Sequence, residues 1–205
     1  MNFANYAAFR VSVLQLIEGD DITDSTFSPD TLDLMIAMGE NRVYRDLRAS
    51  TMLAALSVAV ASNAASLPSD LIELKEVYFS GERPLEIVPL DHLRRHEADE
   101  VVAGSSISRY AAQDGDTLRF WPTATGTVLG KYYKRPSELT TALSTTFTRY
   151  PECFIFAALV ESAPFLGFDD RMPMWEGKYQ QSIANANHDE RMRVWGGSPL
   201  RIRTR

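Results

Sequence analysis

Two histidines are the residues in this sequence whose spacing is best suited to chemistry. His92 and His96 belong to the run His-Leu-Arg-Arg-His-Glu, and on a helix this spacing places both imidazoles on one face, where they could chelate a metal ion. Protein zinc sites use three or four side-chain ligands, and the sequence offers no fixed third ligand beyond the ordinary acidic residues that follow. We therefore interpret the pair as part of a solvated helical face and predict no metal and no other cofactor.

The sequence contains no nucleophile paired with a base at a recognisable spacing. Its single cysteine, Cys153, lies in an apolar helical run, which is typical of a packing residue rather than an activated thiol. The phosphate-binding loop, the dinucleotide-binding glycine pattern and the nucleophile elbow are all missing from the sequence. We therefore predict that the protein is not an enzyme.

The C-terminal tail, residues 195–205, is the strongest candidate for binding a partner. The whole chain carries a net charge of −6, yet no carboxylate accompanies the arginines from Arg191 onward. In an extended tail, apolar residues would alternate with arginines, so the segment could pair with the edge of a partner's sheet. A loose basic terminus is the other interpretation. The residues predicted to bind this partner are Trp195, Leu200, Arg201, Ile202, Arg203 and Arg205.

Nucleic acid is a second class of partner that the sequence allows. The arginine tail could neutralise phosphates, which would give an affinity that falls steeply with salt. Four aromatic residues could stack on bases, although their strand-like spacing is more typical of core and cross-strand packing. These aromatic residues are Phe120, Trp121, Tyr132 and Tyr133. A nucleic-acid-binding protein is therefore the alternative function.

Length and composition narrow the class of protein further. With 205 residues the chain can bury a sizeable core, and with one cysteine it cannot form an intramolecular disulfide. The longest apolar run is interrupted by Glu161 and Pro164, so we expect no membrane span and no membrane partner. The N-terminus also lacks the pattern of a signal peptide. We expect the protein to be made in the cytoplasm.

Helices are predicted toward both ends of the chain. Phe9, Val13, Leu16 and Ile17 fall at helical spacing. Ser28-Pro29 supplies a cap and a first-turn proline for a second helix, whose apolar face comprises Leu32, Met35, Ile36, Val43 and Leu47. Two more helices are expected at residues 151–166 and 171–194, after a connecting loop at residues 137–147 that is rich in Ser and Thr.

The middle of the chain predicts a compact β-rich unit. A strand-like run at residues 74–79 ends at Gly81, and Asp114-Gly115 is a strong hairpin signal. Residues 54–65 fit a strand, with an extension of the second helix as the open alternative. The predicted fold class is therefore α+β, a helical bundle built from both chain ends with an inserted antiparallel β lobe. Its predicted segments are 1–50, 51–136, 137–194 and the tail 195–205.

This order of parts resembles the head-to-tail adaptor (connector) proteins of tailed phages. In that family a helix with a Glu-x-Ala-Pro-like end is followed by an acidic turn and a Trp-Glu-x-x-Tyr helix. Here Glu161 to Pro164 matches the first element, Asp169-Asp170 the turn, and Trp175 to Tyr179 the last element. The likeness covers roughly the last two-thirds of the chain.

The resemblance implies a structural virion protein at the head-to-tail junction. Its copies would form a ring, expected to be a dodecamer, beneath the portal protein, and the portal would be the partner that the tail residues named above bind. Double-stranded DNA would pass through the ring without specific binding, and a downstream tail protein, nozzle or tail tube, would attach on the far side. An acidic body suits such a channel, because binding through counterion release requires cationic contacts.

Overall fold

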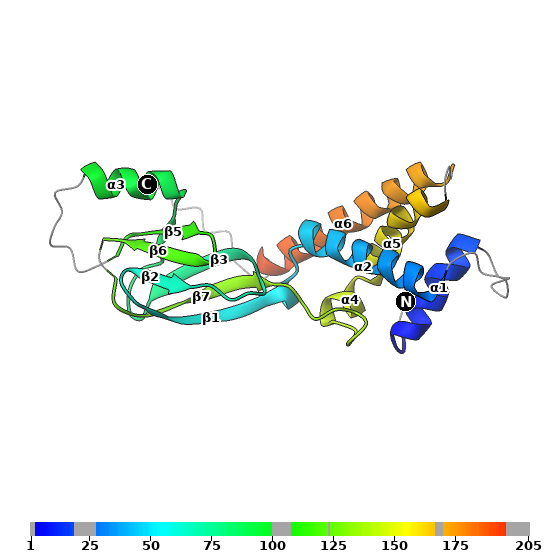
Figure 1. The fold of residues 1–205 in the computed structure, drawn as a ribbon, viewed down its shortest axis with the longest axis horizontal. Coiled ribbons are helices and arrows are strands. Elements are labelled where there is room, and N and C mark those ends of the chain that lie inside the picture. Colours follow the sequence, from blue (N-terminus) through cyan, green and yellow to red (C-terminus); the bar gives the residue numbers. More distant parts are fainter. Residues whose placement is uncertain (1–2, 19–27, 100–107, 123, 167–169, 196–205) are drawn as a thin grey trace. The chain divides into compact units, whose positions relative to one another are not determined.

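A computed structural model describes residues 3–18, 28–99, 108–122, 124–166 and 170–195. Within them the chain forms six α-helices and two β-sheets, which confirms the predicted α+β class (Figure 1). The chain divides into a helical unit, Met1–Thr51 with Pro136–Arg205, and a β unit, Met52–Arg135. No helix in the described part of the chain is long and apolar enough to cross a bilayer.

The helical unit contains five of the helices that the structure describes. They are α1 (Tyr6–Glu18), α2 (Pro29–Asp46), α4 (Thr145–Arg149), α5 (Pro151–Leu166) and α6 (Met172–Trp195). α2 begins as predicted, because the Ser28 hydroxyl accepts a hydrogen bond from the backbone N–H of Thr31 at 3.2 Å. The predicted apolar face of α2 is buried throughout. In α1 the prediction is right for Phe9, Val13 and Ile17, whereas Leu16 is exposed.

The closest helix contact joins α2 to α5. Gly39 lies so near the backbone of α5 that a β-carbon placed on it would be 2.7 Å from the nitrogen of Ala158 and 2.9 Å from the carbonyl carbon of Ala157. Small residues on both helices therefore permit this approach. α6 also packs on α5, and its residues Trp175, Tyr179, Ile183 and Ala186 are buried.

The predicted connecting loop ends earlier than its sequence suggested. Residues 137–147 were expected to lack regular structure, but α4 begins at Thr145. The Ser144 hydroxyl caps it by accepting from the backbone N–H of Phe147. Phe147 is buried between the rings of Phe9 and Phe154, at centroid distances of 4.9 and 5.2 Å. Aromatic packing thus stabilises a short helix that has little propensity of its own.

The β unit is built from two sheets. The first sheet is antiparallel, with β7 (Gly126–Lys134) between β1 (Leu53–Val60) and β3 (Leu71–Phe79). The second has the order β2 (Ala64–Ser66), β6 (Thr117–Trp121), β5 (Tyr110–Asp114) and β4 (Glu86–Ile87). Their shared apolar core includes Leu56, Val77, Phe79, Leu118, Phe120, Val128 and Tyr132.

Residues 54–65 are not an extension of the second helix. A one-turn 3₁₀ helix at Ser50–Met52 precedes β1, in which Leu56 is buried between exposed neighbours. Ser62 and Asn63, both with positive φ, turn the chain into β2. The predicted hairpin joins β5 to β6, and Gly115 has a φ of 60°, which glycine adopts without strain.

The prediction of a purely antiparallel β lobe is wrong at one edge. β4 pairs with β5 in parallel, because the chain between them includes α3 (Leu90–Asp99). A connection of this length returns the chain to the same end of the sheet, as parallel pairing requires. α3 contacts β5 and β6 and buries Leu93.

Candidate partner-binding surfaces

The two candidate metal ligands lie on α3 and have different environments. His92 is exposed, whereas the His96 ring stacks on the Tyr110 ring of β5, with centroids 4.4 Å apart and planes inclined by 6°. Among the described residues, no three His, Cys, Asp or Glu side chains come together as a metal site would require. His96 therefore has a packing role, attaching α3 to the sheet.

Cys153 is fully buried in α5. Removal from solvent raises the pKa of its thiol to about 12, and this effect exceeds the opposing hydrogen bond with Ser182. The thiol is therefore protonated at neutral pH and is not suited to nucleophilic chemistry. Packing is the role that its surroundings support.

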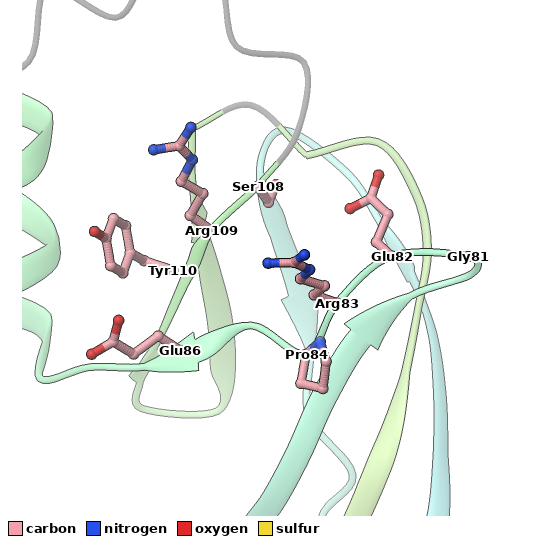
Figure 2. Close-up of a pocket in the computed structure, with 8 residues that line it drawn as sticks. All are labelled: Gly81, Glu82, Arg83, Pro84, Glu86, Ser108, Arg109 and Tyr110. Carbon is pink, nitrogen blue, oxygen red and sulfur yellow. The ribbon is translucent and has the colours of Figure 1, made fainter. Parts of the chain in front are cut away.

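A pocket of about 640 Å³ opens on the β unit (Figure 2). Its walls come from the connection between β3 and β4 and from the start of β5, two segments that the parallel pairing brings together. The lining residues are Gly81, Glu82, Arg83, Pro84, Glu86, Ser108, Arg109 and Tyr110. Sequence reasoning missed this pocket because its two walls are separated by the whole of α3.

The chemistry of this pocket suits recognition rather than catalysis. The Ser108 hydroxyl is buried and donates to the carbonyl oxygen of Pro122 at 3.3 Å. Arg83 and Arg109 are exposed and, with Glu82 and Glu86, give the lining both signs of charge. Such a mixture can form ion pairs with the polar surface of another protein. No nucleophile and base face each other among the lining residues.

Two groups of exposed apolar side chains lie on the helical unit. Leu34 and Met38 lie one turn apart on α2 and are 52% and 39% exposed. Phe165, Met172 and Met174 stand on either side of the connection between α5 and α6 and are 44–56% exposed. Single exposed apolar residues are normal, but repeated ones on neighbouring turns mark surfaces that can contact another protein. The α2 group could have been found in the sequence, because both of its residues are apolar but lie outside the predicted core face of this helix.

A network around Arg42 links three helices of the helical unit. Its guanidinium donates to both carboxylate oxygens of Glu176 on α6, each at 2.8 Å, and to Glu161 on α5 at 3.2 Å. It also lies 4.6 Å from the centre of the Tyr179 ring, whose hydroxyl donates to Asp46 at 2.7 Å. The sequence did not predict this network around Arg42. Its partners are too distant in the chain to be read from spacing.

A second network surrounds Glu190 of α6, which is 4% exposed. Its carboxylate accepts hydrogen bonds from the backbone N–H of Ser50 at 2.8 Å, the Tyr150 hydroxyl at 2.8 Å and the Arg149 guanidinium at 3.1 Å. Burial opposes the charged form, but these hydrogen bonds outweigh it and lower the pKa of Glu190. The network fixes the segment that leads into β1.

The predicted portal-binding residues fall almost entirely outside the described residues. Leu200, Arg201, Ile202, Arg203 and Arg205 belong to residues 196–205, which the structure does not describe. The sequence predicted Trp195 as the first residue of the tail, but in the structure its backbone forms the end of α6. The portal-binding role of these residues therefore stays a prediction.

Apolar surface groups and a charged pocket without a nucleophile are features of a protein that works through contacts with other proteins. A scan against protein-family models matches the SU10 adaptor protein family over residues 4–203, so the chain belongs to this family. This match confirms the resemblance to phage head-to-tail adaptors and supports a structural role in the virion. A search among curated proteins finds no match.

Proposed function

We propose that copies of this chain form a closed ring, expected to be a dodecamer, that joins the portal of the phage head to the tail. The observation that carries this proposal is the match to the adaptor family over residues 4–203. Double-stranded DNA passes through the ring without specific binding, and the acidic charge of the chain limits adhesion to its wall. The protein is made in the host cytoplasm and is incorporated into the virion.

The helical unit, as a bundle contributed by residues 1–50 and 137–194, supplies the contact between neighbouring subunits. Ring closure requires a heterologous interface, in which one surface of each subunit meets a different surface of the next. The α2 group (Leu34 and Met38) and the group between α5 and α6 (Phe165, Met172 and Met174) are two such surfaces. The networks around Arg42 and Glu190 support this assignment, because they hold the helices in one arrangement.

The β lobe, residues 51–136, faces the downstream tail protein, nozzle or tail tube. The observation that supports this assignment is the pocket with Arg83 and Arg109 beside Glu82 and Glu86. Charged groups of both signs at the rim of a contact set its register and specificity more than its affinity. In this proposal the helical unit contacts neighbouring subunits, and the β lobe contacts the downstream tail protein.

The tail docks on the portal through Trp195 and the residues beyond it. Each backbone hydrogen bond of an added strand contributes about 0.5 to 1.5 kcal/mol, and the alternation of Leu200 and Ile202 with arginines sets the register. A chain truncated after Val194 is expected to fold but no longer to bind purified portal rings. Undiminished occupancy of the portal by the cut chain would contradict tail docking.

Two matched variants separate portal docking from the alternative, a nucleic-acid-binding tail. Replacement of Leu200 and Ile202 by serine keeps the charge and removes the apolar side of the strand, so portal binding should fall. Replacement of Arg201, Arg203 and Arg205 by glutamine should instead lower DNA affinity if the tail binds DNA. In that case a plot of the logarithm of DNA affinity against the logarithm of salt concentration would become shallower by about 0.9 for each arginine replaced. DNA affinity that depends on these arginines, with portal binding unchanged in both variants, would favour the alternative.

A further inference from the structure

The antiparallel sheet of the β unit ends in two outer strands, β1 and β3, with β7 between them (Figure 1). An outer strand presents a row of backbone N–H and C=O groups that can pair with another chain. Natural proteins protect such edges with charges, bulges, prolines or covering segments. The two edges of this sheet, β3 and β1, differ in how many of these protections they have.

The edge of β3 is protected in three ways. The strand carries Glu73, Lys75 and Glu76. Its pairing with β7 is interrupted by register shifts between Leu71 and Glu73 and between Leu74 and Glu76. In addition, the backbone N–H of Leu85 donates to the carbonyl oxygen of Val77 at 2.8 Å. A further strand has little regular edge to join on this side.

Among the described residues, the edge of β1 has none of these protections. Its sequence, Leu-Ala-Ala-Leu-Ser-Val-Ala-Val, contains no charge and no proline, and its pairing with β7 is regular over its full length. In the part of the chain that the structure describes, no backbone hydrogen bond from another segment reaches Leu53–Val60. Alternate residues of β1 therefore have outward N–H and C=O groups available for a new strand.

The side chains of β1 also define what such a strand must be. Ala54, Val58 and Val60 pack against the apolar core but are only partly buried, so apolar residues beside them would complete their burial. On the other face, Ala55, Ser57 and Ala59 are exposed, and they are too small to obstruct a neighbour. The matching segment is extended and uncharged, with apolar residues at every second position.

We propose that β1 binds an extended, uncharged strand of the downstream tail protein by continuing its sheet. This inference rests on the proposed function, which makes that protein the partner of the β lobe. A second copy of this chain fits less well. Pairing of β1 with β1 would give a closed two-fold dimer rather than a ring, and the β3 edge of a neighbour is protected.

Hydrogen exchange of the full-length chain tests this proposal directly. We expect amides of Leu53–Val60 to exchange at least about tenfold more slowly in the intact virion than in the free protein, with β3 showing no such change. Unchanged exchange of β1 in the virion would overturn the proposal. Equal protection in rings on portal without tail protein would assign the edge to a second copy, and protection in the free chain that is lost on cutting after Val194 would assign it to the tail. Either result would also overturn the proposal.

A pair of variants tests the same edge by binding. Ala59 and Thr127 are paired across β1 and β7, so their side chains lie on one face, but only Ala59 is on the outer strand. Ala59→Lys is expected to weaken binding to purified downstream tail protein about tenfold, and Thr127→Lys is expected to change it little. Equal effects of the two variants would overturn strand addition. Portal occupancy by Ala59→Lys reports separately on the proposed adaptor function.

Discussion

The helical unit and the β unit are stabilised in different ways. Buried or half-buried charges connect distant segments of the helical unit, and Glu40 and Glu190 are each only 4% exposed. In the β unit, the ion pairs Arg119–Asp114 and Lys131–Glu76 lie on the surface, with all four side chains at least 36% exposed. Such exposed pairs contribute little, about 0 to 1 kcal/mol. The β unit therefore depends on its apolar core and strand pairing.

This difference is consistent with the proposal that each unit makes a different kind of contact. Directional networks fix one arrangement of helices, as a repeated interface between identical subunits requires. Apolar burial is non-directional, and it leaves the backbone edge of β1 open to a further strand. Three predictions test whether the two units behave as differently as their contacts indicate.

The largest effect is expected from Gly39→Val in the helical unit. Its added side chain would meet the backbone of Ala157 and Ala158 at less than 3 Å, so the free energy of unfolding should fall by about 3 kcal/mol or more. Gly177→Ala is the control, because nothing lies within 4 Å of its added β-carbon, and it should raise stability by up to about 1 kcal/mol. Chemical unfolding followed by far-ultraviolet circular dichroism measures both.

Hydrogen exchange of the Gly39→Val variant sharpens the comparison. We expect faster exchange in α2 and α5 and near-normal exchange in β7, because the two units have separate cores. Equal loss of protection in both units would mean that they unfold together. The claim that the helical unit and the β unit are stabilised independently would then be wrong.

In the β unit the corresponding substitution is Gly130→Ala. Its β-carbon would lie 2.2 Å from the carbonyl oxygen of Glu76, and this backbone atom cannot move without disturbing the β3–β7 pairing. We expect a loss of about 2 kcal/mol in the free energy of unfolding, with faster exchange confined to the β unit. Thr127→Ala, at an exposed position of the same strand, should cost less than about 1 kcal/mol. Equal losses for both variants would contradict a specific role for Gly130.

A smaller, pH-dependent effect is expected from Glu190→Gln. Because folding lowers the pKa of Glu190 from 4.5, its contribution is fully present above that pH and is lost as the pH falls through the folded-state pKa. The variant should lose about 2 kcal/mol of unfolding free energy at pH 7. Below pH 4.5 the difference from the unchanged chain should shrink.

Urea unfolding of both chains between pH 3 and 7 measures this difference. Glu138→Gln is the control, because Glu138 is exposed and its substitution should change stability by less than about 0.5 kcal/mol. A gap between Glu190→Gln and the unchanged chain that stays constant with pH would show that the charge of Glu190 is not what stabilises the network.

Local signals in the sequence predicted much of the fold. The Ser28 cap, the helical spacing of the apolar residues in α2 and the hairpin at Gly115 each depend on a few neighbouring residues. α4 and the parallel β4–β5 pair were not predicted, because both depend on packing between distant segments. For the same reason the sequence did not identify the networks around Arg42 and Glu190 or the pocket.

An electron micrograph of the purified chain, alone and mixed with its portal, tests the adaptor role most directly. We expect a monomer or small oligomer alone, checked by light scattering at micromolar concentration, because weak contacts become effective once a preformed ring aligns many copies. In the mixture we expect a closed ring of this chain seated on the portal. A stable closed ring without portal would contradict portal-templated assembly alone, whereas portals that stay bare at saturating concentrations of the chain would contradict the adaptor role itself.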